Sequence, residues 1–210
     1  FDHSVYLANG CRVKIANMSG NEYGDVNGVS PCGNYLVTTR SRVDTVPETL
    51  LIDRNGEQIL RIEIADVSGL PADWQWPEPV KLKGADGKTD IYGVVFLPPG
   101  FSPDKSYPVV EYANAARTFS GSPQGSFINS QQDGFVYYFS SALAALGFIV
   151  VTMDGRGTPL RNKSFADHHY GDPAFTSDFT DRIAGLQQLA KRYPSMDLER
   201  VGITSPEDPT

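Results

Sequence analysis

The chain has 210 residues, of which 40% are hydrophobic and 20% are charged, an ordinary globular composition that excludes an intrinsically disordered protein. The formal net charge of −7 argues against a nucleic-acid partner and against adsorption to anionic membrane surfaces, because no basic stripe is present to neutralise phosphates. The longest apolar stretch, residues 142–153, is too short to span a bilayer and contains a glycine, so we expect no membrane partner.

The N-terminal residues and the cysteines bear on the compartment without deciding it. The chain opens with Phe1 and has no initiator methionine, basic segment or signal-type apolar segment. The favoured interpretation is a chain that begins part-way through a longer protein, with removal of a leader as the alternative. Cys11 and Cys32 are too few for a disulfide framework and lack CxxC-type metal spacing. Isolated buried thiols are favoured over a pair with each other, and the redox compartment stays open.

Residues 1–65 are predicted to form short β-strands. The Asn9-Gly10 and Asn55-Gly56 pairs have the composition of tight turns between neighbouring strands. Closely spaced short strands indicate an all-β unit such as a sandwich, a barrel or a propeller blade, and the stretch is too short for a complete propeller. The expected strands are residues 5–8, 12–16, 35–41, 48–53 and 57–63.

Residues 66–79 are predicted to be a linker between two domains. Pro71, Pro77 and Pro79 lie close together here, and regular structure is not expected to run through them. Trp74 and Trp76 are candidates for stacking on a ligand, but packing at the domain junction is their favoured role.

From residue 80 to residue 210 the pattern becomes that of an α/β domain. Helices are expected at residues 137–146, ended by Gly147, and at residues 178–193, ended by Pro194. Their alternation with strands predicts a parallel sheet with crossover helices, opened by an antiparallel hairpin. The expected strands are residues 80–83, 91–97, 109–112, 148–153 and 200–204.

The sequence Asp154-Gly155-Arg156-Gly157 follows an apolar strand and precedes an amphipathic helix. This motif, together with others upstream in the same chain order, resembles the prolyl oligopeptidase family, and its dipeptidyl peptidase IV branch most closely. The stretches 86–93 and 97–101 resemble the first hairpin of the family's catalytic domain, and residues 107–110 resemble its next strand. Upstream, Ser30–Tyr35 resembles the SPDG turn of the preceding propeller, with cysteine in place of the usual aspartate.

The resemblance implies both a fold and an activity. The fold is an incomplete α/β-hydrolase sheet preceded by strands that resemble the last part of a β-propeller, with an active site between the two domains. The activity is that of a serine peptidase that takes short peptides as substrates, including removal of N-terminal dipeptides after proline. No cofactor is expected. Family members of this kind favour a secreted or periplasmic location, and the oligomeric state stays open, a homo-oligomer included.

The catalytic serine itself is missing from its expected place. In an α/β-hydrolase the nucleophile lies in a G-x-S-x-G turn after a strand, which here is Val201–Thr204. By the family's spacing, Ser205 falls where the first glycine belongs and Glu207 where the serine belongs. The acid and the histidine follow the serine in chain order, so they would lie beyond Thr210. We therefore expect the Ser/Asp/His triad to be absent and this chain alone to be inactive.

One catalytic element is expected to remain. In the resembled family, a tyrosine hydroxyl that stabilises the oxyanion follows the strand that begins Pro-Val-Val, and Tyr112 holds that position here. The family continues with Gly-Pro, whereas this chain has Asn114-Ala115. The other interpretation of Tyr112 is a residue that ends a strand and packs at the edge of the sheet.

The Asp154–Gly157 turn is predicted to be structural and close to the site. An acid and a guanidinium in such a turn commonly pair to fix the loop, so this role is favoured for Asp154 and Arg156 over substrate contact. Gly155 and Gly157 are expected because the turn needs a positive φ.

The three histidines offer weaker alternatives. No serine lies in a G-x-S-x-G context, so a second triad built from His3, His168 or His169 is disfavoured. A metal cluster of His168 and His169 with Asp167 and Asp172 is also disfavoured, because adjacent histidines on a polar loop point in different directions.

Three functional hypotheses remain open at this point. The favoured one is a fragment or truncated product of an active serine peptidase. The second is a pseudo-peptidase that keeps the fold in order to bind peptides or a partner. The third is an esterase-type hydrolase that shares the sheet.

Overall fold

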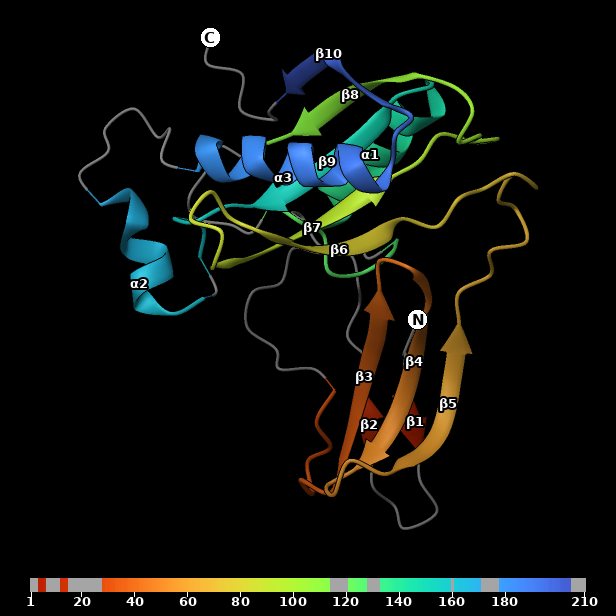
Figure 1. Ribbon diagram of the computed structural model, residues 1–210. Coiled ribbons are helices and arrows are strands. Elements are labelled where there is room, and N and C mark those ends of the chain that lie inside the picture. Colours follow the sequence, from red (N-terminus) through yellow and green to blue (C-terminus); the bar gives the residue numbers. More distant parts are fainter. Residues whose placement is uncertain are drawn as a thin grey trace, which may run out of the picture.

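The computed structural model describes residues 4–6, 12–14, 28–113, 121–127, 133–159, 161–170 and 178–204. Its larger sheet has five strands in the order β10-β8-β9-β7-β6 (Figure 1). β7 runs antiparallel to β6 and β9, whereas β8 is parallel to both of its neighbours, β9 and β10. The carboxyl ends of these three parallel strands therefore lie at one edge of the sheet. The bounds are β6 Glu78–Lys83, β7 Asp90–Phe96, β8 Tyr107–Tyr112, β9 Ile149–Asp154 and β10 Met196–Thr204.

Two helices cover opposite faces of this sheet (Figure 1). α1 (Asp133–Ala145) packs on one face and α3 (Phe179–Arg192) on the other. β9 is mostly apolar because both of its faces are buried: Val150 contributes to the core under α1, while Val151 contributes to the core under α3. Gly147 ends the turn after α1 with a φ of +100°, as expected for a glycine at that position.

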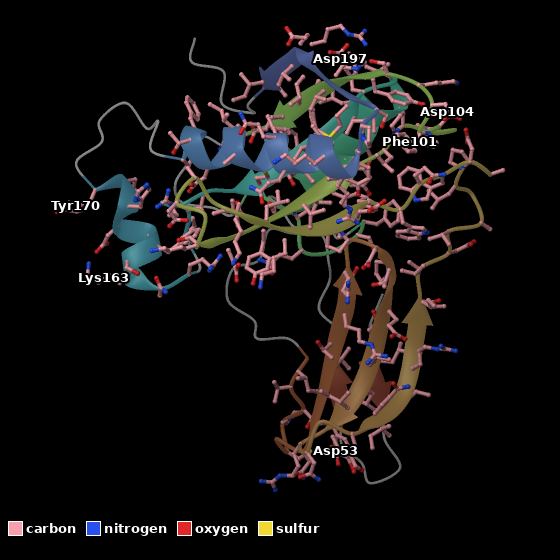
Figure 2. The ribbon with its side chains drawn as sticks, in the orientation of Figure 1. Asp53, Phe101, Asp104, Lys163, Tyr170 and Asp197 are labelled. Atoms are coloured by element: carbon pink, nitrogen blue, oxygen red, sulfur yellow. The ribbon has the colours of Figure 1, made fainter. Side chains whose placement is uncertain are left out.

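Both helices and all five strands lie where the sequence predicts them, with bounds that differ by a few residues. A short helix, α2 (Lys163–Ala166), followed by one 3-10 turn (Asp167–His169), was not predicted. Asn162 begins α2 by accepting a hydrogen bond from the backbone N–H of Phe165 at 2.9 Å. Four residues are too few to show an apolar period, so only the cap residue marks this helix in the sequence. Lys163 is the first residue of α2, and Tyr170 follows the 3-10 turn (Figure 2).

A smaller antiparallel sheet, β3-β4-β5, extends from one side of the larger sheet (Figure 1). β3 is Tyr35–Arg42, β4 is Thr45–Asp53 and β5 is Gln58–Ile64, and Val37 and Leu51 form its small core. Asp53 closes the predicted Asn55-Gly56 turn by accepting from the N–H groups of Asn55 and Glu57, each at 2.8 Å. Figure 2 shows Asp53 at the end of this sheet that is far from the larger sheet. β1 (Ser4–Tyr6) and β2 (Arg12–Lys14) pair antiparallel, and the Asn9-Gly10 turn predicted between them lies outside the described residues.

The junction between the two sheets differs from the prediction at one proline. β6 begins at Glu78 and contains Pro79, so regular structure does run through this position. A proline is tolerated there because β6 is the edge strand of the sheet and Pro79 is only its second residue. Trp74 and Trp76 pack at the junction as predicted, with ring centroids 6.5 Å apart and both close to Phe127.

The preference for isolated cysteine thiols is wrong for Cys32. Cys32 is disulfide-bonded, and the only other cysteine of the sequence, Cys11, lies outside the described residues. Two cysteines at such a distance in the sequence carry no local signal for pairing, which depends on how the chain folds back.

Candidate active site

The carboxyl edge of the larger sheet brings Tyr112 beside the end of β10. Tyr112 is the last residue of β8 and lies opposite Thr204, the last residue of β10. The N–H of Ala113 donates a hydrogen bond to the carbonyl oxygen of Thr204 at 2.8 Å. Ligands of open α/β sheets bind outside the carboxyl ends of the strands, so this edge is the candidate active site. Ser205 and Glu207, the predicted positions of the nucleophile turn, lie outside the described residues.

The Tyr112 side chain is buried, yet its hydroxyl lacks a hydrogen-bond partner among the described residues. Only 2% of the residue is exposed, and its ring lies 6.1 Å from that of Phe139 on α1. Burial raises the pKa of the Tyr112 hydroxyl, so it is a neutral O–H donor at physiological pH. An interior hydroxyl without a partner carries a desolvation cost that a hydrogen bond to a ligand oxygen would offset. The hydroxyl therefore has the chemistry of a donor for a ligand oxygen.

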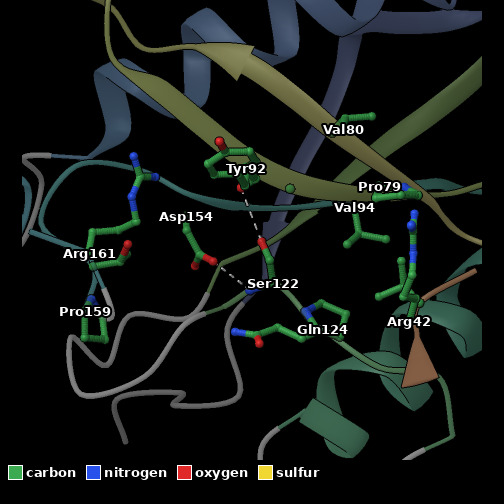
Figure 3. Close-up of a pocket in the computed structure, with 14 residues that line it drawn as sticks. Arg42, Pro79, Val80, Tyr92, Val94, Ser122, Gln124, Asp154, Pro159 and Arg161 are labelled. Atoms are coloured by element: carbon green, nitrogen blue, oxygen red, sulfur yellow. Dashed lines mark hydrogen bonds between the residues drawn. The ribbon is translucent and has the colours of Figure 1, made fainter. Parts of the chain in front are cut away.

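Asp154, at the end of β9, holds the segment 121–127 at the same edge of the sheet (Figure 3). Its carboxylate accepts hydrogen bonds from the N–H of Gly121 at 2.6 Å and of Ser122 at 3.4 Å. The Ser122 hydroxyl donates to the carbonyl oxygen of Tyr92 on β7 at 3.5 Å. Asp154 thus fixes the backbone of a loop.

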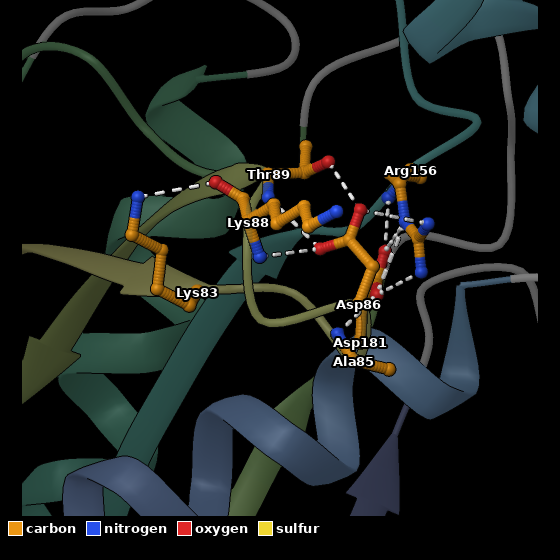
Figure 4. Close-up of polar contacts among 7 residues, drawn as sticks. All are labelled: Lys83, Ala85, Asp86, Lys88, Thr89, Arg156 and Asp181. Carbon is orange, nitrogen blue, oxygen red and sulfur yellow. Dashed lines mark hydrogen bonds and ion pairs between the residues drawn. The ribbon is translucent and has the colours of Figure 1, made fainter.

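Arg156 fixes a different set of turns (Figure 4). Its guanidinium contacts the buried carboxylate of Asp181 on α3 at 2.8 and 2.9 Å, and Asp86 in the β6–β7 turn at 3.2 Å. Asp181 also accepts from the N–H of Ala85 at 2.8 Å. Burial alone would raise the pKa of Asp181, but the hydrogen bonds from Arg156 and Ala85 outweigh it and lower that pKa. The carboxylate therefore stays ionised and ties three segments together.

The two glycines of this turn are required for different reasons, which corrects the prediction. Gly157 has a φ of +110°, in the left-handed region that favours glycine. Gly155 does not have a positive φ. A Cβ at Gly155 would instead lie 2.7 Å from the Cβ of Asp178, too close for any side chain.

A buried ion pair beside Tyr112 was missed by the sequence analysis. Glu111 precedes Tyr112 on β8 and points to the α3 face, where its carboxylate lies 2.7 Å from the guanidinium of Arg182. Arg182 also contacts Asp178, one turn earlier in α3, at 2.7 Å. Burial raises the pKa of Glu111, and Arg182 opposes that rise. A glutamate inside the otherwise apolar run of β8 and the Asp178–Arg182 spacing were the only signals in the sequence.

A pocket of about 430 Å³ lies between the two sheets, next to this edge (Figure 3). Strands β6 and β7 contribute Val80, Tyr92 and Val94 to its wall. The turn between β3 and β4 contributes Arg42 and Val43. Ser122, Gln124, Asp154, Pro159 and Arg161 complete most of the lining. The pocket is therefore lined jointly by the N-terminal sheet and the α/β domain.

The remaining predicted candidates do not gather into a site. His168 and His169 lie in the 3-10 turn after α2, and Asp172 lies outside the described residues. Within the described ranges, no three histidine, cysteine, aspartate or glutamate side chains come together as a metal site would require. In the same ranges no helix is both long and apolar enough to cross a membrane.

Comparison with known proteins agrees with this geometry. A family model described as the prolyl oligopeptidase family matches residues 136–204. Human dipeptidyl peptidase 8 is 34% identical over 140 residues, which cover 67% of this chain and 15% of that protein. The mouse protein of the same name is 33% identical over 140 residues, with the same coverage. The chain therefore spans about 15% of the length of these curated relatives.

Solved structures give the same result for the fold. A structure described as a dipeptidyl aminopeptidase IV from Bacteroides ovatus has a TM-score of 0.66 at 25% identity, covering 84% of this chain and 24% of that one. Dipeptidyl peptidase 4 from Porphyromonas gingivalis has a TM-score of 0.59 at 22% identity, covering 96% of this chain and 27% of that one, and shows the fold alone.

The sheet order and its carboxyl-edge site define an α/β-hydrolase domain that follows β-strands of a propeller type. The chain belongs to the prolyl oligopeptidase family of serine peptidases and is similar to its dipeptidyl peptidase IV-like members.

Proposed function

We propose that this chain carries the oxyanion-binding side of a serine-peptidase active site that cleaves short peptides. The observation that carries the proposal is Tyr112, whose buried hydroxyl lacks a hydrogen-bond partner among the described residues and lies at the end of β8 beside the end of β10. Attack of a serine on a peptide carbonyl places a negative charge on the carbonyl oxygen. A neutral O–H that is already held at this edge stabilises that charge without reorganisation. Release of N-terminal Xaa-Pro dipeptides is the proposed specificity.

The proposal assigns the nucleophile, the acid and the histidine to residues outside these 210. No serine of the chain lies in a G-x-S-x-G turn, so we expect the purified 210-residue chain to remain unlabelled by a fluorophosphonate probe. Labelling of a single serine in this chain would refute that assignment.

The decisive experiment replaces Tyr112 by phenylalanine in the full-length product of the gene that encodes these residues. Phenylalanine keeps the ring in its packing and removes only the hydroxyl. Loss of one oxyanion donor lowers kcat by about 10²–10³-fold, and we expect KM for a Gly-Pro anilide substrate to change little. The matched control is Tyr138→Phe on α1, where the side chain is exposed. Equal kcat values for the two variants would contradict the proposal.

Assays of the same full-length gene product distinguish the proposed peptidase from the two alternative functions. Binding of peptides without turnover, measured by calorimetry, would favour a pseudo-peptidase. Turnover of simple esters without turnover of Xaa-Pro amides would favour an esterase.

A further inference from the structure

The turn between β3 and β4, Arg42–Thr45, belongs to the N-terminal sheet but packs inside the α/β domain. Val43 is only 3% exposed and shares a buried cluster with Tyr112 and Tyr137. The Tyr137 hydroxyl donates to the carbonyl oxygen of Val43 at 3.5 Å. Figure 1 shows this end of the hairpin directed at the larger sheet. We call Arg42–Thr45 the hairpin tip.

The segment 121–127 is bound by this hairpin at its C-terminal end, whereas Asp154 binds its N-terminal end. Ser126 is fully buried, and its N–H donates to the hydroxyl oxygen of Ser41 at 3.0 Å. The Ser126 hydroxyl in turn donates to the carbonyl oxygen of Thr45. One short loop is therefore hydrogen-bonded to the N-terminal sheet at one end and to the end of β9 at the other.

The next residue, Phe127, has an unusual backbone conformation that its surroundings maintain. Its φ is +50°, a region that non-glycine residues rarely adopt because of steric cost. Its ring lies 5.9 Å from that of Trp74, 5.8 Å from that of Trp76 and 5.1 Å from that of Tyr137. Such strain persists only where the packing fixes it, so these rings lock the loop in place.

A continuous chain of contacts joins this anchor to Tyr112. Tyr137 packs against Phe127, and its hydroxyl donates a hydrogen bond to the hairpin tip. Tyr137 also packs edge-on against Phe96, at 5.6 Å, in the cluster that holds Tyr112. On the same helix, Phe139 lies against the Tyr112 ring. The position of the Tyr112 ring is thus set in part by the N-terminal sheet.

We infer that the hairpin tip is a positioning element for the Tyr112 hydroxyl, acting through the segment 121–127 and α1. The inference rests on the proposed function for its catalytic consequence, but not for the anchoring itself. No residue of the hairpin tip needs to contact the substrate. Its role is to hold the donor where the oxyanion forms.

The anchoring is tested first on the 210-residue chain. Trp74 and Trp76 are its only tryptophans, and both contact Phe127, so intrinsic fluorescence reports this packing. We expect Val43→Ala and the milder Ser41→Ala to shift the emission to longer wavelength and to increase quenching by acrylamide. The matched control Val29→Ala lies in an exposed position near β3 and should leave both unchanged. Circular dichroism identifies a variant that has failed to fold, in which case Ser41→Ala decides.

The catalytic consequence is tested in the full-length gene product. A donor misplaced by about 1 Å loses up to 10²-fold in rate, so we expect Val43→Ala to lower kcat about 10-fold with KM nearly unchanged. In a Tyr112→Phe background the same change should have little further effect on kcat, because the donor is already gone.

The outcomes separate the two proposals. Unchanged fluorescence in Val43→Ala and Ser41→Ala, or an equal loss of kcat with and without the Tyr112 hydroxyl, would overturn the inference. Altered fluorescence together with full activity of Tyr112→Phe would leave the anchoring in place and refute the proposed function instead.

Discussion

Replacement of Arg182 by methionine tests the buried ion pair on the α3 face of β8. Arg182 is 2% exposed and contacts the carboxylates of Glu111 and Asp178, each at 2.7 Å. Methionine keeps most of the side-chain volume but leaves the Glu111 carboxylate buried without its cation. Removing one partner of a buried pair costs about 3–5 kcal/mol of the free energy of unfolding.

The loss of unfolding free energy in Arg182→Met should increase as the pH rises. Burial raises the pKa of Glu111 in the folded protein, and Arg182 opposes that rise, so the variant has a still higher folded pKa. Below its unfolded pKa of about 4.3, such a carboxyl is protonated in both states and does not oppose folding. As the pH rises through its folded pKa, the free energy of unfolding falls. We therefore expect the deficit of Arg182→Met to be largest at pH 7 and smaller near pH 4.5.

Urea unfolding of the 210-residue chain measures this difference. With a denaturant slope of about 2 kcal/mol/M for a protein of this size, the midpoint at pH 7 should fall by roughly 1.5–2.5 M. The control is Arg200→Met, which removes an exposed pair with Asp197 and should cost at most about 1 kcal/mol. The double variant Glu111→Leu with Arg182→Met should regain most of the loss, because it removes both buried charges. Equal midpoints for Arg182→Met and Arg200→Met would refute the reasoning.

Three further substitutions test the turns and the smaller core. Gly155→Ala places a Cβ against Asp178 and should cost about 1–3 kcal/mol in urea unfolding, whereas Gly69→Ala, with open space around it, should be nearly neutral. Arg156→Lys loses the forked contact with Asp181 and should cost about 1–2 kcal/mol, while Arg40→Lys, at an exposed single contact, should cost little; equal losses would contradict this. Leu51→Ala should lower the thermal midpoint by several degrees through a cavity worth about 2–5 kcal/mol, and a similar shift for the exposed Leu60→Ala would show that burial is not the cause.

The order of strands and helices could be predicted because each element carries a local pattern. The apolar run of β9, the period of α3 and the positive-φ Gly147 are visible within a few residues of sequence. The position of Tyr112 at the end of β8 follows from the same local signals. Its nearness to the end of β10 follows once β8 and β10 are parallel neighbours, since parallel strands end at a common edge.

The ion pairs that fix this edge could not be predicted because they join segments far apart in the sequence. Arg156 was expected to pair with Asp154 in the same turn. Its guanidinium instead contacts Asp181 in α3 and Asp86 in the β6–β7 turn. The Glu111–Arg182 pair likewise depends on how α3 lies across the sheet. Pairing of this kind is decided by tertiary packing, and a glutamate in a strand is a poor signal by itself.

Three segments at the carboxyl edge are each held by a different set of contacts. The end of β8 is held by an ion pair to α3. The turn after β9 is held by Asp181 and by the β6–β7 turn. The segment 121–127 is held by Asp154 and by the N-terminal sheet. The N-terminal sheet contributes Val43 to the buried cluster that contains Tyr112, and the carbonyl oxygen of Thr45 accepts a hydrogen bond from the Ser126 hydroxyl. It follows that a substitution at the hairpin tip should act on the chemical step, whereas a change on the distant exposed face of β5 should not.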